Sequence, residues 1–224
     1  PSIHNPSNFN TLTPRMEPFT FSKLSSCHNL AAFIITLLCF SISFTKTCLA
    51  TTKVETHSNS TNKEFIKSSC GETMYPRLCF KTLSTYASTI QTSPAELANA
   101  ALTVSLKGAQ STSEMVLNLS RGHNLSPEEA RAITDCMENM EDTVDELQQS
   151  MEAMKDLEGP DFDTKMGNIL TWVSAALTDE DTCMDGFKGN GMDGKIKGTI
   201  RSYIVNVAKL TSNALALVNR LSSA

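Results

Sequence analysis

The stretch ARAITDCMENMEDTVDELQQSMEAM, residues 130–154, has the apolar spacing of one long amphipathic helix. Its apolar residues recur at alternating intervals of three and four, which is a heptad seam that needs a partner helix to cover it. The seam consists of Ala130, Ile133, Met137, Met140, Val144, Leu147, Met151 and Met154. The same periodicity places four acids outward, opposite the seam: Asp135, Glu138, Asp142 and Asp145. The four methionines are interpreted as core filler.

Start and stop signals place three further helices around this one. Ser93-Pro94-Ala95-Glu96 and Ser126-Pro127-Glu128-Glu129 each put a capping serine before a helical proline, with a glutamate three residues after the serine. Glycine, asparagine and proline then mark breaks between the helices. We expect helices over residues 94–120, 127–157, 163–187 and 194–221, preceded by short helical pieces broken at Gly71 and Pro76.

Two of the other helices also show an apolar stripe. The last helix repeats the heptad spacing with Ile196, Ile200, Tyr203, Val207, Leu210, Ala214, Leu217 and Leu221. In the helix over 163–187 the stripe is Met166, Leu170, Val173 and Leu177. Trp172 lies off that stripe, as a boundary packing residue or an interface contact. No alternating run indicates a strand. The sequence therefore predicts an all-α fold, an antiparallel up-and-down four-helix bundle.

The chain before the bundle has the features of a secretory signal. Residues 1–15 are polar and patternless, and we expect them to lie upstream of a true start at Met16. Residues 16–50 then form a signal peptide, with an apolar core over 30–44 and cleavage before Thr51. A membrane anchor is less favoured, because so short an apolar run barely spans a bilayer. Residues 51–62 are expected as a polar spacer and 63–222 as the bundle domain.

The mature chain expected after cleavage is acidic. The whole chain has 19 basic and 24 acidic side chains, and removing three bases and one acid with residues 1–50 leaves 16 and 23, net −7. That balance repels nucleic acid and acidic polysaccharide. An acidic protein of this kind suits a basic partner, and no membrane partner is expected once the signal is removed.

Four cysteines remain after signal removal, an even number that predicts two disulfides in a secreted chain. Cys136 lies 23 residues before the break at Gly159 and Cys183 lies 24 residues after it. At ~1.5 Å per residue, both lie roughly 35 Å from the turn. In antiparallel neighbours they therefore meet at one level, which favours a Cys136–Cys183 staple and leaves Cys70–Cys79 as a local clasp. Other pairings stay open, although geometry favours none.

The acids of the quoted helix do not indicate a catalytic or metal centre. Nine acids and one base lie between Asp135 and Glu158, but a di-iron bundle needs inward Glu-x-x-His pairs. The mature chain has only His57 and His123. Residues 179–194 lack the spacing of a calcium loop, and the chain has no nucleophile or phosphate-loop motif. We expect no enzyme, no metal and no cofactor, so the acids either face water or face a partner.

Five segments resemble the plant invertase and pectin methylesterase inhibitor family. They are CGETMYPRLC, SLKGAQ, ITDCMENMEDTVDELQQS, TWVSAALTDEDTC and LTSNALALVN, and the resemblance covers about residues 63–221. It implies a four-helix bundle preceded by a small helical hairpin, with the first cysteine joined to the second and the third to the fourth. It also implies secretion to the cell wall or apoplast, no cofactor, and inhibition by covering an enzyme's active-site cleft in a 1:1 complex.

The family has two branches with different targets. Invertase inhibitors carry Pro-Lys-Phe before the third bundle helix, whereas this chain has Pro160-Asp161-Phe162 there. An acid in place of that cation is unfavourable beside the paired carboxylates of a glycosidase. The chain therefore resembles the pectin methylesterase branch more, with pectin methylesterase as the expected partner. The enzyme-binding residues implied by that branch are Glu138, Asp142, Asp145, Thr182 and Asp185.

Three alternatives stay open at this stage. They are an inhibitor of cell-wall or vacuolar acid invertase, the pro-region of a pectin methylesterase, and a structural or defence protein with no enzyme target. A free-standing inhibitor is favoured over a pro-region because no catalytic domain follows Cys183 in this sequence.

Met140 stands where many members have tyrosine, and as a seam residue it is expected to change only packing. Glycosylation sequons begin at Asn59, Asn118 and Asn124, the last disfavoured by Pro127.

Overall fold

In the computed structural model, the described part of the chain comprises residues 58–122, 125–188 and 194–223, and its regular structure is entirely helical. A first helix covers residues 58–70, so residues 58–62, expected as part of a polar spacer, are helical. The later elements are α2 (Pro76–Leu83), the 3-10 helix η1 (Ser84–Tyr86), α3 (Ala87–Ile90), α4 (Pro94–Ser120), α5 (Pro127–Met154), α6 (Phe162–Asp185) and α7 (Gly194–Ser222). Within the described residues, no helix is both long and apolar enough to cross a bilayer.

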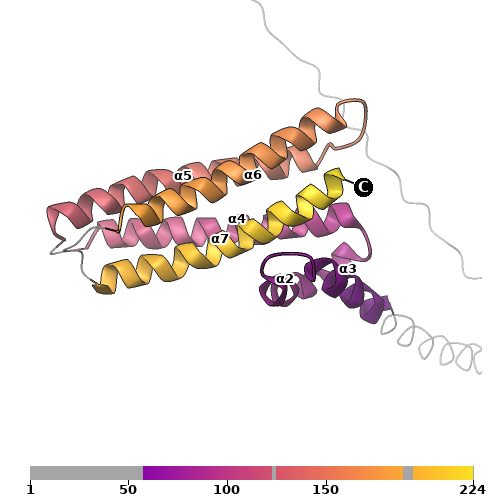
Figure 1. Cartoon of the computed structure of the whole chain (residues 1–224), viewed down its shortest axis with the longest axis horizontal. Helices are drawn as coiled ribbons and strands as arrows, with labels where there is room; N and C mark the ends of the chain where they lie inside the picture. The colour runs from indigo at the N-terminus through magenta and orange to yellow at the C-terminus, as the bar shows by residue number, and fades with distance from the viewer. Residues whose placement is uncertain (1–57, 123–124, 189–193, 224) are drawn as a thin grey trace, which may run out of the picture. The chain divides into compact units, whose positions relative to one another are not determined.

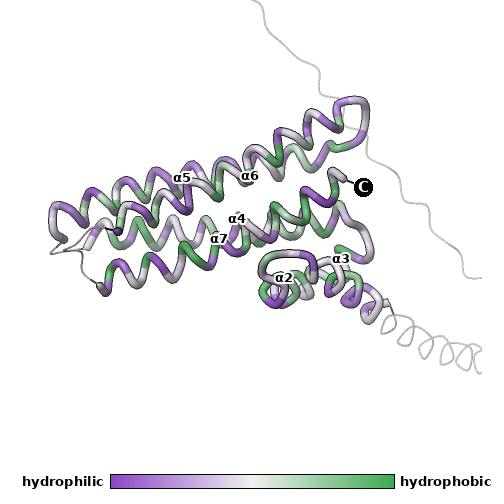
Figure 2. Tube along the Cα trace, viewed as in Figure 1, coloured by the Kyte–Doolittle hydropathy of each residue, from purple (hydrophilic) through white to green (hydrophobic). Residues whose placement is uncertain are grey.

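The four long helices form the expected up-and-down bundle (Figure 1). Helix α4 packs against α5 and α7, and α6 packs against the same two helices. Along each helix, hydrophobic and hydrophilic segments alternate, as an amphipathic pattern requires (Figure 2). The observed helix ends lie within three residues of the predicted ones. The predicted fold class is confirmed.

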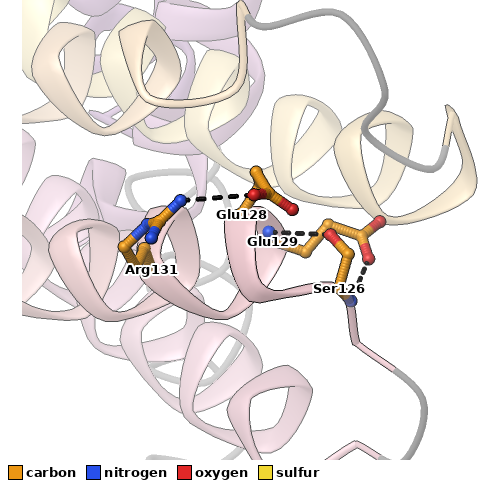
Figure 3. A network of polar contacts seen from close by, with 4 residues as sticks. All are labelled: Ser126, Glu128, Glu129 and Arg131. Atoms are coloured by element: carbon orange, nitrogen blue, oxygen red, sulfur yellow. Dashed lines mark hydrogen bonds and ion pairs between the residues drawn. The ribbon is translucent and has the colours of Figure 1, made fainter.

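The two serine–proline signals begin α4 and α5 as expected. The Ser126 hydroxyl accepts a hydrogen bond from the Glu129 backbone N–H at 3.1 Å, and the Glu129 carboxylate accepts one from the Ser126 N–H at 2.9 Å. Figure 3 shows this reciprocal pair, with the Glu128–Arg131 ion pair beside it. At the start of α4 the capping box is incomplete. The Ser93 side chain accepts a hydrogen bond from the Glu96 N–H, but the Glu96 carboxylate does not accept one from the Ser93 N–H. Each bond satisfies a backbone donor that a helix start leaves without a partner.

Two cross-links fix the register of α5 against α6. The disulfide Cys136–Cys183 brings the two Cα atoms to 4.3 Å. Two turns further along α5, the Thr143 hydroxyl shares its proton between the Asn139 carbonyl at 2.9 Å and the Ala176 carbonyl of α6 at 3.4 Å. The residue number rises by seven on α5 as it falls by seven on α6, so the two helices are antiparallel, as the staple argument assumed. The second disulfide is the expected local clasp between Cys70 and Cys79.

The heptad seam of α5 is only partly correct as a description of the buried face. Ile133, Met140 and Leu147 are fully buried, but Ala130 is exposed and the remaining seam residues are half-buried. The buried stripe includes Cys136 and two polar residues instead. These are Thr143 and Ser150, whose hydroxyls donate to backbone carbonyls one turn earlier. The buried stripe still follows intervals of three and four, but contact with two neighbouring helices centres it on the positions beside Met137, Val144 and Met151.

The stripes of α7 and α6 need similar corrections. On α7, Tyr203 is 42% exposed and Ile204 is buried in its place. On α6, Ile169 and Ala176 are buried, whereas the predicted Leu170 and Leu177 are half-buried. The buried residues of α6 keep the heptad intervals of three and four, at Met166, Ile169, Val173, Ala176, Glu180 and Cys183. The period was therefore right, and the prediction erred only in choosing between adjacent positions.

A hairpin made of the first helix and α2 is attached to the bundle by one buried amide. Asn213 on α7 is 3% exposed, and its Oδ1 accepts from the Tyr75 backbone N–H at 3.0 Å. Its Nδ2 donates to the Tyr75 carbonyl at 3.2 Å. Arg220 adds an ion pair to Glu72 at 3.1 Å. Asn213 thus supplies the partner of the Tyr75 N–H, whereas the Tyr75 carbonyl also accepts a hydrogen bond from the Cys79 N–H at the start of α2.

We expect Asn213→Ala to lower the free energy of unfolding by about 1–3 kcal/mol, since both hydrogen bonds are lost and the Tyr75 N–H keeps no partner, whereas the Tyr75 carbonyl still accepts from the Cys79 N–H at 2.9 Å. The measurement is urea denaturation, with limited proteolysis to follow cleavage within residues 71–75. Asn206→Ala, an exposed amide on the same helix, is the matched control. Equal stability of the two variants would contradict a clamping role for Asn213.

Candidate functional site

The five residues implied by the family resemblance all lie exposed on the α5–α6 pair. On α5, Glu138, Asp142 and Asp145 follow one another at intervals of four and three, so they share the outward side of the helix. None of the three forms an ion pair with any residue of the described chain. Their negative charge is therefore available to an incoming partner. Together with Thr182 and Asp185, these residues are called the α5–α6 face below.

The α6 members of the face lie next to the staple. Thr182 precedes Cys183 and donates its hydroxyl to the Thr178 carbonyl at 2.8 Å, which leaves the oxygen lone pairs free to accept. Asp185 is the last residue of α6 and forms an ion pair with Lys188. Since the disulfide joins the two helices at this level, Thr182 and Glu138 occupy the same end of the bundle. Only the α5 acids carry an uncompensated charge.

A carboxyl pair that the sequence analysis missed joins the two helices beside Asp142. Glu146 on α5 and Asp179 on α6 are neighbouring carboxyl groups, and their interaction favours the protonated form of Glu146 and the charged form of Asp179. Partial burial is the largest cause that raises the pKa of Glu146 to about 7, and the charge and hydrogen bond of Asp179 and the charge of Asp142 contribute to that value. Burial and Asp142 also raise the pKa of Asp179, although the bond from Glu146 opposes this. The pair therefore holds a proton near neutral pH and lowers the charge of this part of the face.

The sequence indicates the contact of Glu146 with Asp142 but not its contact with Asp179. Asp142 and Glu146 are four residues apart, so they lie close together on one helix. Asp179 belongs to another helix, and its approach depends on the rotation of α6 about its own axis. In the predicted α6 stripe Met166 and Val173 are buried as expected, but Leu170 and Leu177 were each one residue off, so the rotation of α6 was not fixed well enough to show this contact.

Further along the same two helices lies a groove of about 480 Å³. Its lining residues, called the Trp172 groove, are Gln149, Glu152, Ala153, Asp156, Lys165, Asn168 and Trp172. The α5 lining residues follow Asp145 at intervals of three and four, so they lie on the same side of α5 as Asp142 and Asp145. The α6 lining residues likewise lie on the same side of α6 as Asp179. Trp172 is half-buried, so its indole is part of the groove wall and not of the core.

Comparison with known proteins assigns this architecture to a family. The model of the family described as plant invertase/pectin methylesterase inhibitor matches residues 64–217. The chain belongs to this inhibitor family. A protein of Daucus carota named "21 kDa protein" is 50% identical over 71% of this chain and 84% of its own length. "Pectinesterase inhibitor 11" of Arabidopsis thaliana is 46% identical over 69% and 79%.

A solved structure shows the same fold. The crystal structure of mutant form A of a pectin methylesterase inhibitor from Arabidopsis aligns with a TM-score of 0.55 at 22% identity. The alignment covers 67% of this chain and 92% of that one. The family expectation of a helical bundle with two disulfides is confirmed.

The Pro160-Asp161-Phe162 segment, on which the sequence analysis based the choice of branch, lies in the α5–α6 turn. Asp161 is exposed there and its side chain makes no capping hydrogen bond to α6. Phe162, the next residue, is half-buried and packs against the core. The exposed group of this turn is consequently a carboxylate, where the invertase-inhibitor motif has a lysine.

Two of the three predicted glycosylation sites are accessible. Asn59 is exposed on the first helix, and Asn118 is exposed near the end of α4. Asn124 lies outside the described residues. Whether the exposed asparagines carry glycans stays a prediction, and neither belongs to the α5–α6 pair.

Proposed function

We propose that this chain is a secreted inhibitor of pectin methylesterase, which blocks the active-site cleft of the enzyme in a 1:1 complex and limits pectin de-esterification in the cell wall. Membership of the inhibitor family supports the class, and a relative named as a pectinesterase inhibitor supports the target. The observation that carries the proposal is the row of exposed acids on α5 without a cation opposite them. Such a row is suited to basic or hydrogen-bonding groups around a cleft.

The arrangement also suits a rigid docking surface. The Cys136–Cys183 disulfide and the Thr143–Ala176 hydrogen bond fix α5 against α6, so the face is preorganised and little conformational entropy is lost on binding. Complementary charge mainly speeds association and selects the partner. Rejection of nucleic acid and of acidic polysaccharide follows from the same charge.

An acid invertase is the second candidate target, because both branches share the fold. Asp161 argues against it: its exposed carboxylate would approach an active site that already holds carboxylates. Phe162 is retained from the Pro-Lys-Phe motif, but it packs inward. The pectin methylesterase branch is therefore preferred. A helical protein with no enzyme target remains the third reading.

Two parallel titrations test the proposal, with the oxidised mature chain added to a plant pectin methylesterase and to an acid invertase. We expect esterase activity to fall linearly and to vanish at one equivalent, while invertase activity stays unchanged. Loss of invertase activity alone would place the chain in the other branch. No effect on either enzyme would favour a structural or defence role.

A further inference from the structure

The Trp172 groove differs in charge from the α5–α6 face beside it. Lys165 forms an ion pair with Asp156 at 2.8 Å, and Lys155 forms one with Glu152. Both carboxylates of the groove are thus paired with an ammonium group, whereas the three α5 acids of the face form no ion pair within the described residues. The groove is therefore close to neutral, although it continues an acidic helix surface. A ligand can therefore bind in this groove without carrying a net charge.

The remaining lining groups are one large aromatic ring and two amides. The indole of Trp172 offers a flat apolar surface with a single N–H donor. Gln149 and Asn168 lie on opposite helices, and each amide both donates and accepts hydrogen bonds. Both amides are exposed, and neither side chain forms a hydrogen bond with another part of the described chain. They are thus free to bind a ligand.

We propose that the Trp172 groove binds an uncharged pyranose unit of a glycan chain. A pyranose has an apolar face of C–H groups, which can lie on the indole, and a rim of hydroxyl groups that donate and accept. The amides supply both functions from the two walls, and the ion-paired carboxylates accept from further hydroxyls. A volume of about 480 Å³ accommodates one or two sugar rings. Binding here does not depend on the inhibition of any enzyme.

Other occupants agree less well with these observations. A uronate or another anion would meet two carboxylates, and the two ammonium groups are already paired with them. An apolar ligand would bury amides and carboxylates without replacing their hydrogen bonds to water. A protein partner could use Trp172 as an anchor, but interfaces usually have charged residues at the rim and not around the anchor. A neutral sugar can offer hydroxyl groups to the amides and carboxylates and a C–H face to the indole.

The fluorescence of Trp172 reports the groove directly, because it is the only tryptophan of the chain. The oxidised chain is titrated with a methyl-esterified oligogalacturonide, a neutral cello-oligosaccharide and a fully de-esterified oligogalacturonate. We expect a saturable change in emission with at least one neutral sugar, and the two neutral arms show whether pectin or a glucan is its source. Binding of the charged sugar is expected to be at least 10-fold weaker.

The variant Asn168→Ala keeps the fluorophore and should weaken binding of the neutral sugar about 3- to 10-fold, through loss of one or two hydrogen bonds. Asn206→Ala, the same change on α7 outside the groove, should leave the affinity unaltered. Trp172→Ala should abolish the ligand signal in saturation-transfer NMR, with circular dichroism confirming the fold. The proposal is overturned by the absence of saturable binding to either neutral sugar, by equal affinity for the charged one, or by an emission change that occurs only with added esterase.

Discussion

Replacing Glu138, Asp142 and Asp145 together by lysine is expected to weaken inhibition of pectin methylesterase at least 100-fold, which is about 3 kcal/mol of binding free energy. The three acids share one side of α5, and no described base neutralises them. Reversal turns each favourable approach to a basic or hydrogen-bonding group into a repulsion, and like charges facing each other across an interface cost several kcal/mol. Inhibition constants measured at constant ionic strength give the effect.

The fold should survive this change, because all three side chains are exposed and contribute little to stability. A control that reverses Glu64, Glu158 and Asp163 shifts the net charge equally while leaving the α5–α6 face intact. These three acids are also exposed. If the first variant inhibits as well as the control variant, the three acids of α5 only solvate the helix and do not contact the enzyme. Unfolding in the first variant alone would show up in circular dichroism.

Local signals in the sequence predicted the boundaries of the fold well. The serine–proline–glutamate segments marked the starts of α4 and α5, because capping depends on residues within one turn. The cysteine pairing followed from counting residues on either side of one turn. The outward placement of Glu138, Asp142 and Asp145 needed only the period of a helix.

What the sequence could not supply was the rotation of each helix against two neighbours. Tyr203 and Ile204 compete for one buried position, and a strict heptad chose the wrong one. The same uncertainty hid the approach of Asp179 to Glu146. Glu180 was not singled out either, because an acid on a helix is normally solvated and its burial shows only when α7 is in place.

Glu180 is a carboxyl group inside the bundle core. It is 0% exposed, and its Oε1 accepts a hydrogen bond from the Thr211 hydroxyl of α7 at 2.7 Å. Thr211 is 2.7 Å from the Ser105 hydroxyl of α4, so the group connects three helices. The second oxygen, Oε2, is buried and has no hydrogen-bond partner in the described chain. A charged carboxylate in this position would lack solvation on one side.

Burial therefore raises the pKa of Glu180 to about 8, with smaller contributions from the charges of Asp181 and Asp179. The hydrogen bond from Thr211 opposes this but does not outweigh it. In the unfolded chain the pKa is near 4.5. Between these values Glu180 binds more protons in the folded than in the unfolded protein, so its contribution to stability is highest below about pH 4.5 and is lost as the pH rises to about 8.

We expect the free energy of unfolding to fall by about 3–5 kcal/mol over that range, at roughly 1.4 kcal/mol per pH unit. Glu180→Gln keeps the shape and the bond to Thr211 without a charge, so most of the pH dependence should disappear in this variant. A smaller slope of the same sign should remain from Glu146, whose pKa is also raised. Urea denaturation of both proteins at pH 4.5, 6 and 8 measures the difference. Parallel pH profiles of the two proteins would contradict this prediction. They would mean that Glu180 does not take up a proton on folding, so that replacing it by the uncharged glutamine removes no pH dependence.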